Sequence, residues 1–175
     1  MVPVSDLLPP ADQPEAPLQQ RAHHIAGAVY GTILATTVVA TSGFGPETVT
    51  RSLVIVAVTS AVFWAAHVYS LGIAARIVVR RPLSRVEQRS IAVAEWPMLQ
   101  SSWPILLTLL LGSLGIIDPS TAISLAMAVG IGALFTYGFI MGRQEHLGWP
   151  RVLLNATVTG GFGLVILAMK VVVHH

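Results

Sequence analysis

The chain of 175 residues contains no cysteine, which excludes disulfides, thiolate metal sites and thiol redox chemistry. Charge is also scarce, because Asp, Glu, Lys and Arg make up only 10% of the residues, against about 25% in a typical soluble domain. The formal net charge of +2 gives no support for a nucleic-acid partner. Hydrophobic residues, in contrast, account for 54%. A soluble protein of this composition would lack the polar side chains to cover its core. We therefore predict an integral membrane protein whose main partner is the lipid bilayer.

Long segments without charged residues predict how often the chain crosses the membrane. The gaps after Glu95, Asp118 and Arg151 contain 22, 24 and 18 residues, and two comparable gaps precede them. A spanning helix needs about 20 apolar residues, and it satisfies its own backbone hydrogen bonds in lipid. The prediction is an all-α integral membrane protein, one domain over residues 21–175. Its five transmembrane helices are expected at about 25–42, 52–75, 96–117, 119–142 and 152–173.

Helix-end signals refine two of these segments. The stretch "SRVE" from Ser84 to Glu87 is typical of a capping box, so the third helix is expected to begin before the membrane, at its cytoplasmic side. Pro97 and Pro104 each lack a backbone N–H donor, which predicts that this helix is kinked. Asp118 directly precedes Pro119 and is placed to cap the fourth helix.

Basic residues predict the orientation. Five arginines crowd the second connection, and three more lie before the first span or beside the fourth connection, against two basic residues on the other side. The positive-inside rule then places the N-terminus in the cytoplasm and the C-terminus outside, in the plasma (inner) membrane. The same cluster is a candidate contact for anionic lipid. Its members are Arg76, Arg80, Arg81, Arg85 and Arg89.

The first twenty residues differ from the rest in composition. They hold five prolines and three acidic residues, with no basic residue. This composition is typical of an extended tail, and the segment lacks the charged start and apolar centre of a signal peptide. We therefore predict a proline-rich cytoplasmic tail over residues 1–20, either idle or used to dock a partner.

Small residues recur at four-residue spacing in three of the predicted spans. Such stripes allow helix backbones to approach closely in a membrane. They are expected to pack the helices of one chain together, with contacts between subunits of a homo-oligomer as the alternative. The residues are Gly27, Gly31, Ala35, Ala126, Gly130, Ala156 and Gly160.

Polar residues fall at a similar depth in all five predicted spans, with His67 the one clear intramembrane histidine. Either the hydroxyl groups bond their own helix carbonyls and one of them satisfies a neutral His67, or the layer lines a hydrated cavity where His67 exchanges a proton. Tyr30, Ser101 or Ser102 are the expected partners of His67. Glu95 is expected nearer the cytoplasmic mouth. The layer comprises His67, Tyr30, Ser101, Ser102, Thr136, Asn155 and Thr157.

The predicted spans carry no recognisable catalytic or cofactor-binding pattern. The sequence has no Gly-x-Ser-x-Gly elbow and no clustered intramembrane metal ligands, so neither an enzyme nor a metal site is predicted. Haem ligation through His67 would need a second histidine at the same depth, which only a symmetry-related His67 was expected to supply. No cofactor is therefore predicted.

Three classes of function remain open on this evidence. The polar layer and the predicted kinks favour a small channel or transporter for a solute or ion, with homo-oligomerisation as a way to build a pore. The absence of a site motif and the small-residue stripes favour an accessory or scaffold subunit of a larger membrane complex. A membrane enzyme or haem protein is the third class, and it has the least support.

Overall fold

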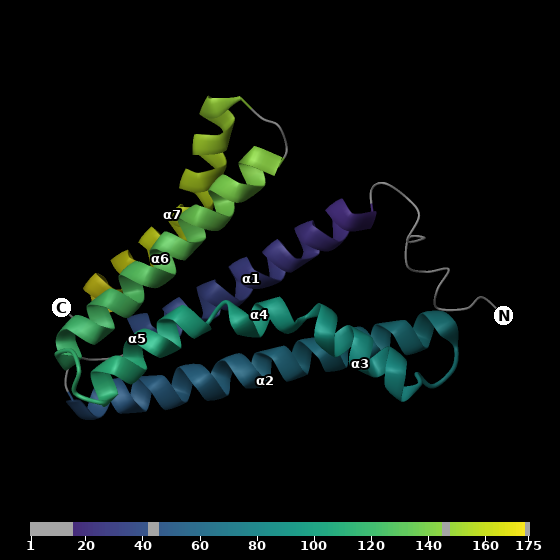
Figure 1. The fold of residues 1–175 in the computed structure, drawn as a ribbon, viewed down its shortest axis with the longest axis horizontal. Coiled ribbons are helices and arrows are strands. Elements are labelled where there is room, and N and C mark those ends of the chain that lie inside the picture. The colour runs from purple at the N-terminus through teal and green to yellow at the C-terminus, as the bar shows by residue number, and fades with distance from the viewer. Residues whose placement is uncertain (1–15, 42–45, 145–147, 174–175) are drawn as a thin grey trace.

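The computed structural model describes residues 16–41, 46–144 and 148–173, and their regular secondary structure is entirely helical (Figure 1). The predicted tail lies outside these residues up to position 15, while its last five residues already belong to the first helix. The helices are α1 (Ala16–Ala40), α2 (Pro46–Val79), α3 (Arg85–Ala94), α4 (Trp96–Gln100), α5 (Trp103–Ser113), α6 (Pro119–Gln144) and α7 (Trp149–Val173).

Four of the described helices are long and apolar enough to cross a membrane, namely α1, α2, α6 and α7. Their surfaces expose many large apolar side chains, such as Val58, Val62 and Leu154, which suits contact with lipid rather than water. These features are compatible with a membrane protein. The predicted count of five spans is not confirmed, because the segment expected to form the third span is divided into shorter helices.

The segment from Arg85 to Ser113 forms three successive helices that run back along α2 (Figure 1). The predicted single kinked helix is thus replaced by α3, α4 and α5, with breaks at Glu95 and at 101–102. Pro97 and Pro104 follow the two breaks and lack the N–H that would continue the hydrogen-bond ladder. At the second break, the hydroxyls of Ser101 and Ser102 donate to the carbonyls of Met98 and Leu99, at 2.8 and 2.7 Å.

The apolar core lies toward one end of the bundle. Its buried members come from the last turns of α1, the first turns of α2 and α6, and α5, with Ile166 of α7. Val39, Val49, Leu109 and Ile123 are fully buried there. At the other end, α6 and α7 lean away from α2 and α3 (Figure 1). The helices therefore pack together through buried apolar side chains at the end opposite to Glu95.

The small-residue stripes lie at contacts between helices of the same chain. Gly27 and Gly31 of α1 face Met98 of α4, and Gly130 of α6 faces Thr36 of α1. Gly160 faces the ring of Phe135, while Ala35, Ala126 and Ala156 are buried. A side chain at Gly31 would collide with the Met98 carbonyl oxygen and the Ser101 hydroxyl. The absence of a side chain there is what lets α4 lie directly on α1.

Both predicted N-caps are confirmed. The Oδ2 atom of Asp118 accepts hydrogen bonds from the backbone N–H groups of Ser120 and Thr121, at 3.0 and 3.2 Å. The Ser120 hydroxyl also donates to it, and these bonds, with that of Ser120 first, lower the pKa of the carboxyl. Ser84 and Glu87 form the capping box, in which the Ser84 N–H donates to Glu87 Oε2 at 2.7 Å.

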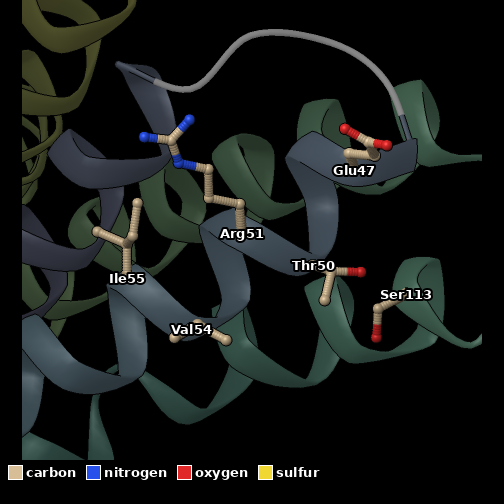
Figure 2. A pocket seen from close by; sticks show the side chains of 6 residues that line it. All are labelled: Glu47, Thr50, Arg51, Val54, Ile55 and Ser113. Carbon is tan, nitrogen blue, oxygen red and sulfur yellow. The ribbon is translucent and has the colours of Figure 1, made fainter.

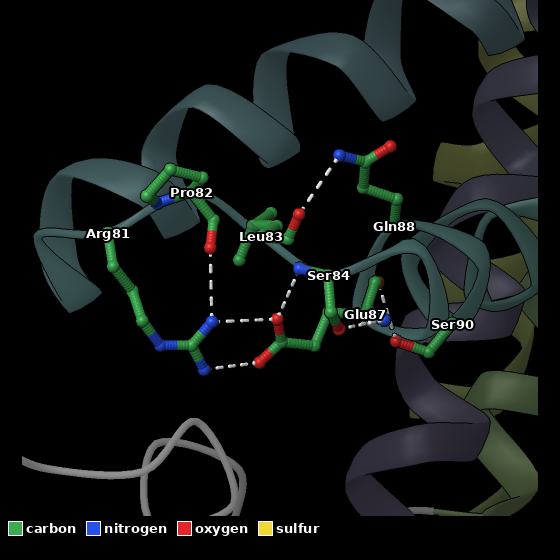
Figure 3. A network of polar contacts seen from close by, with 7 residues as sticks. All are labelled: Arg81, Pro82, Leu83, Ser84, Glu87, Gln88 and Ser90. Carbon is green, nitrogen blue, oxygen red and sulfur yellow. Dashed lines mark hydrogen bonds and ion pairs between the residues drawn. The ribbon is translucent and has the colours of Figure 1, made fainter.

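The turn between α2 and α3 is closed by an ion pair (Figure 3). Arg81 donates two hydrogen bonds to the carboxylate of Glu87, at 2.7 and 3.0 Å. The Arg81 guanidinium, followed by the Ser84 backbone, lowers the pKa of Glu87 to about 2. The preceding residue, Arg80, has a positive φ of 52°, a left-handed conformation that ends α2. One pair thus fixes the geometry of the α2–α3 turn.

Replacing Glu87 by Gln is expected to loosen this turn without unfolding the bundle. Because the folded-state pKa lies below the ordinary 4.5, the pair contributes its stability fully above about pH 4.5 and loses it as the pH falls toward 2. Hydrogen exchange of backbone amides 83–90 should be faster in Glu87→Gln at pH 7 and unchanged in α6. Equal exchange in the variant and the parent would show that the pair does not hold the turn.

Candidate functional site

Glu95 is a buried carboxylate at the junction between α3 and α4. Its side chain is only 4% exposed, and its backbone, at φ −89° and ψ 0°, lies in the sparsely populated bridge region where active-site residues are often found. The Glu95 N–H donates to the Ile91 carbonyl, and the Glu95 carbonyl accepts from the Met98 N–H. The break in the helix thus turns a charged side chain toward the interior.

Two histidines from different helices contact the two oxygens of this carboxylate. Nε2 of His23, on α1, lies 2.6 Å from Oε1 of Glu95, within hydrogen-bond distance. Nε2 of His67, on α2, lies 3.4 Å from Oε2. The histidine side chains are 52% and 43% exposed. The cluster of His23, Glu95 and His67, called the His–Glu–His cluster below, therefore joins a buried acid to two more accessible imidazoles.

Tryptophan rings adjoin this cluster. Trp64 lies one helical turn before His67, and its ring packs edge to face on Trp96, the residue after Glu95, with centroids 5.9 Å apart. Trp96 in turn packs on Trp103 at 6.5 Å. The indole N–H of Trp64 is buried and has no hydrogen-bond partner among the described residues. Burying an unpaired donor is unfavourable.

The structure corrects the expected surroundings of His67. Its contact is with Glu95 rather than with a hydroxyl of Tyr30, Ser101 or Ser102. Both serine hydroxyls bond carbonyls of their own segment. Tyr30 is nearly half exposed and packs on Phe63. The two serine hydroxyls thus bond their own helix carbonyls, as the first interpretation of the polar layer predicts. His67 contacts Glu95 instead of any of the three expected partners.

The remaining members of the predicted polar layer lie away from the cluster. Thr136 is exposed on α6 and donates to the Gly132 carbonyl at 2.8 Å. Thr157 is exposed and Asn155 is half-buried, both on α7, which leans away from α2 and α3. These three residues are therefore not brought together with His67.

The pairing of His23 with Glu95 was not predicted. His23 lies just before the first predicted span, and the sequence predicts no partner for Glu95 at the cytoplasmic mouth. The available signal was that Glu95 is the only acid between Glu87 and Asp118, and that it precedes a proline by two residues. A lone acid at a helix break is a reason to look for a basic partner at the same depth.

The described residues contain no group of three or more His, Asp or Glu side chains arranged to hold a metal ion. In the His–Glu–His cluster the reason is geometric. Two ligand atoms held tetrahedrally at about 2.0–2.1 Å from a zinc ion lie about 3.3 Å apart. The 2.6 Å between His23 Nε2 and Glu95 Oε1 is the distance of a hydrogen bond instead.

A shallow depression of about 920 Å³ lies at the opposite end of α2 (Figure 2). It is broad and open, and the side chains of Glu47 and Arg51 do not converge in it (Figure 2). It contains no histidine among its lining residues. The His–Glu–His cluster is therefore the stronger candidate site. The depression is lined by Glu47, Thr50, Arg51, Val54, Ile55 and Ser113.

Comparison with protein-family models, with curated proteins and with solved structures finds no match.

Proposed function

We propose that this chain is a small membrane channel or transporter that moves a solute or ion in a proton-dependent way, through the His–Glu–His cluster. The observation that carries the proposal is the burial of Glu95 between the Nε2 atoms of His23 and His67. Ionisable groups inside membrane proteins are costly and commonly mark ion or proton pathways.

The arrangement offers a short proton path. Histidine is the side chain whose ordinary titration falls in the physiological range. Nε2–H of His67 gives its proton to Oε2 of the Glu95 carboxylate. The neutral carboxyl group then turns so that this O–H faces His23, and Nε2 of a His23 that carries no proton on that nitrogen accepts it. The titratable groups that face Glu95 from α1 and α2 are these two histidines.

The proposal treats α4 and α5 together as a fifth crossing, with the N-terminus in the cytoplasm of the inner membrane and the C-terminus outside. The arginine distribution supports this orientation. His67 comes 20 residues after Glu47, or about 30 Å along α2 at 1.5 Å per residue. With Glu47 in the outer headgroup layer, His67 and the cluster then lie in the cytoplasmic half of the hydrocarbon layer, and the end of α2 reaches the cytoplasmic headgroups.

The test is proton flux into proteoliposomes with an internal pH-sensitive dye and an imposed pH gradient. The parent is expected to raise proton flux above protein-free liposomes, and His23→Gln to lower the increment at least about tenfold, because glutamine cannot carry a proton near neutrality. His24→Gln is the matched control. His24 adjoins His23 but has no hydrogen bond or ion pair with a described residue, so its flux should equal that of the parent.

Equal flux in His23→Gln and His24→Gln would remove the cluster from the pathway. Parent flux no greater than that of protein-free liposomes would contradict a proton path through the cluster. It would favour the alternative function, an accessory subunit of a larger complex. The size of the protein purified in mild detergent would then show whether other proteins remain bound to it.

A further inference from the structure

The end of α2 and the whole of α3 form a hairpin that projects past the His–Glu–His cluster (Figure 1). From His67 to Val79, α2 continues for twelve residues, or about 18 Å. None of the residues of α3 is buried. This hairpin therefore presents an exposed surface that the bundle itself does not use.

The hairpin carries an unbalanced positive charge. It holds five arginines and one acid, and the acid is already bound by Arg81. The other four arginines are exposed and have no hydrogen bond or ion pair with a described residue. They are Arg76, Arg80, Arg85 and Arg89.

Large apolar side chains are exposed between these arginines. Ile77 is 70% exposed and Val86 is 78% exposed, and Val78 and Val93 are similarly accessible. Val86 and Val93 are seven residues apart and share a face of α3. Arg85 and Arg89 lie on the neighbouring face. Water is a poor solvent for such valines, and the centre of a bilayer is a poor solvent for such arginines.

We propose that the α2–α3 hairpin lies in the headgroup layer and binds anionic phospholipid. The exposed valines and Ile77 enter the boundary of the acyl chains, and Arg76, Arg80, Arg85 and Arg89 contact lipid phosphates. The Arg81–Glu87 pair is not part of the binding set, because it fixes the turn that holds the two helices in position. This refines the predicted lipid contact from five arginines to four.

The mixed surface favours a lipid over other anionic partners. A nucleic acid or a free phosphate ion would bind the arginines but would make no favourable contact with the exposed valines. An anionic membrane surface satisfies both, since it attracts nearby arginines with about 1 kcal/mol each and accepts apolar side chains.

The experiment measures phosphatidylglycerol binding to the detergent-purified full chain by native mass spectrometry, with phosphatidylcholine as the neutral comparison. The double variant Arg85→Gln/Arg89→Gln should weaken phosphatidylglycerol binding roughly ten- to thirtyfold. The matched control is Arg143→Gln/Arg151→Gln, which removes two arginines from the α6–α7 connection and should weaken it less than about threefold. Hydrogen exchange of α3 in the unmodified protein should be slower in phosphatidylglycerol nanodiscs than in phosphatidylcholine nanodiscs.

Three results would overturn the inference. Equal weakening in the two double variants would show that only total charge matters. Equal binding of phosphatidylcholine would show an apolar contact alone. Displacement of the lipid by millimolar inorganic phosphate, with no change in α3 exchange between the two nanodiscs, would show a phosphate site rather than a lipid site.

Discussion

Glu95→Gln is expected to abolish the proton flux that the parent supports in proteoliposomes, with a loss of at least about tenfold and up to the background level. Glutamine has nearly the shape of glutamate and still offers an oxygen to His23 and a second polar group to His67. It removes the proton-binding carboxylate between them. The variant should therefore keep the fold and lose the proton path. Dye-reported flux in proteoliposomes measures the path, and thermal unfolding in detergent measures the fold.

Glu47→Gln is the control for this change. Glu47 is also an acid at a helix end, in the first turn of α2, but it is far along the helix from His67 and has no ion pair with a described residue. Its flux should match the parent. A Glu95→Gln variant that folds and conducts like Glu47→Gln would show that Glu95 only holds the histidines in place or does nothing in transport.

Gly31→Ala is expected to lower both stability and flux, although it adds a single methyl group. The added carbon would collide with the Met98 carbonyl oxygen and the Ser101 hydroxyl, and a backbone atom of α4 has little freedom to move aside. Overpacking of this kind costs about 1–3 kcal/mol. Because α4 begins one residue after Glu95, pushing it from α1 also separates His23 from Glu95.

The matched control is Gly132→Ala on α6, where an added carbon would meet no atom within 4 Å. There the better helix propensity of alanine should leave stability equal or slightly higher. Thermal unfolding of both variants in one detergent compares them directly. Gly31→Ala as stable and as active as Gly132→Ala would mean that α1 and α4 are not packed this closely.

Much of the helical architecture could be predicted from the sequence, because its signals are local. Charge-free segments and proline positions predict long apolar helices, and the caps at Ser84 and Asp118 involve neighbours three residues apart. The length of the third span could not be predicted in the same way. Its composition is apolar throughout, but two proline-associated breaks leave α5 with eleven residues.

Only part of the candidate site could be predicted from the sequence. His67 and Glu95 stand out because charged and titratable groups are rare in apolar segments, and both were selected. Their contact depends on how far each helix is shifted along its neighbour, and the sequence predicted Glu95 nearer the cytoplasmic mouth than His67. His23 lies 72 residues from Glu95, and no local pattern links them. Close packing of α1 on α4 through Gly31 is what joins the two.

The most direct test of the account is solid-state NMR of the protein in lipid bilayers, with ¹⁵N-labelled histidine and ¹³C-labelled glutamate. The account predicts through-space transfer from the Glu95 carboxyl carbon to the Nε2 atoms of both His23 and His67. It also predicts that Glu95→Gln alters the signals of both imidazoles. A Glu95 carboxyl without transfer to either imidazole, or histidine signals unaffected by Glu95→Gln, would contradict it.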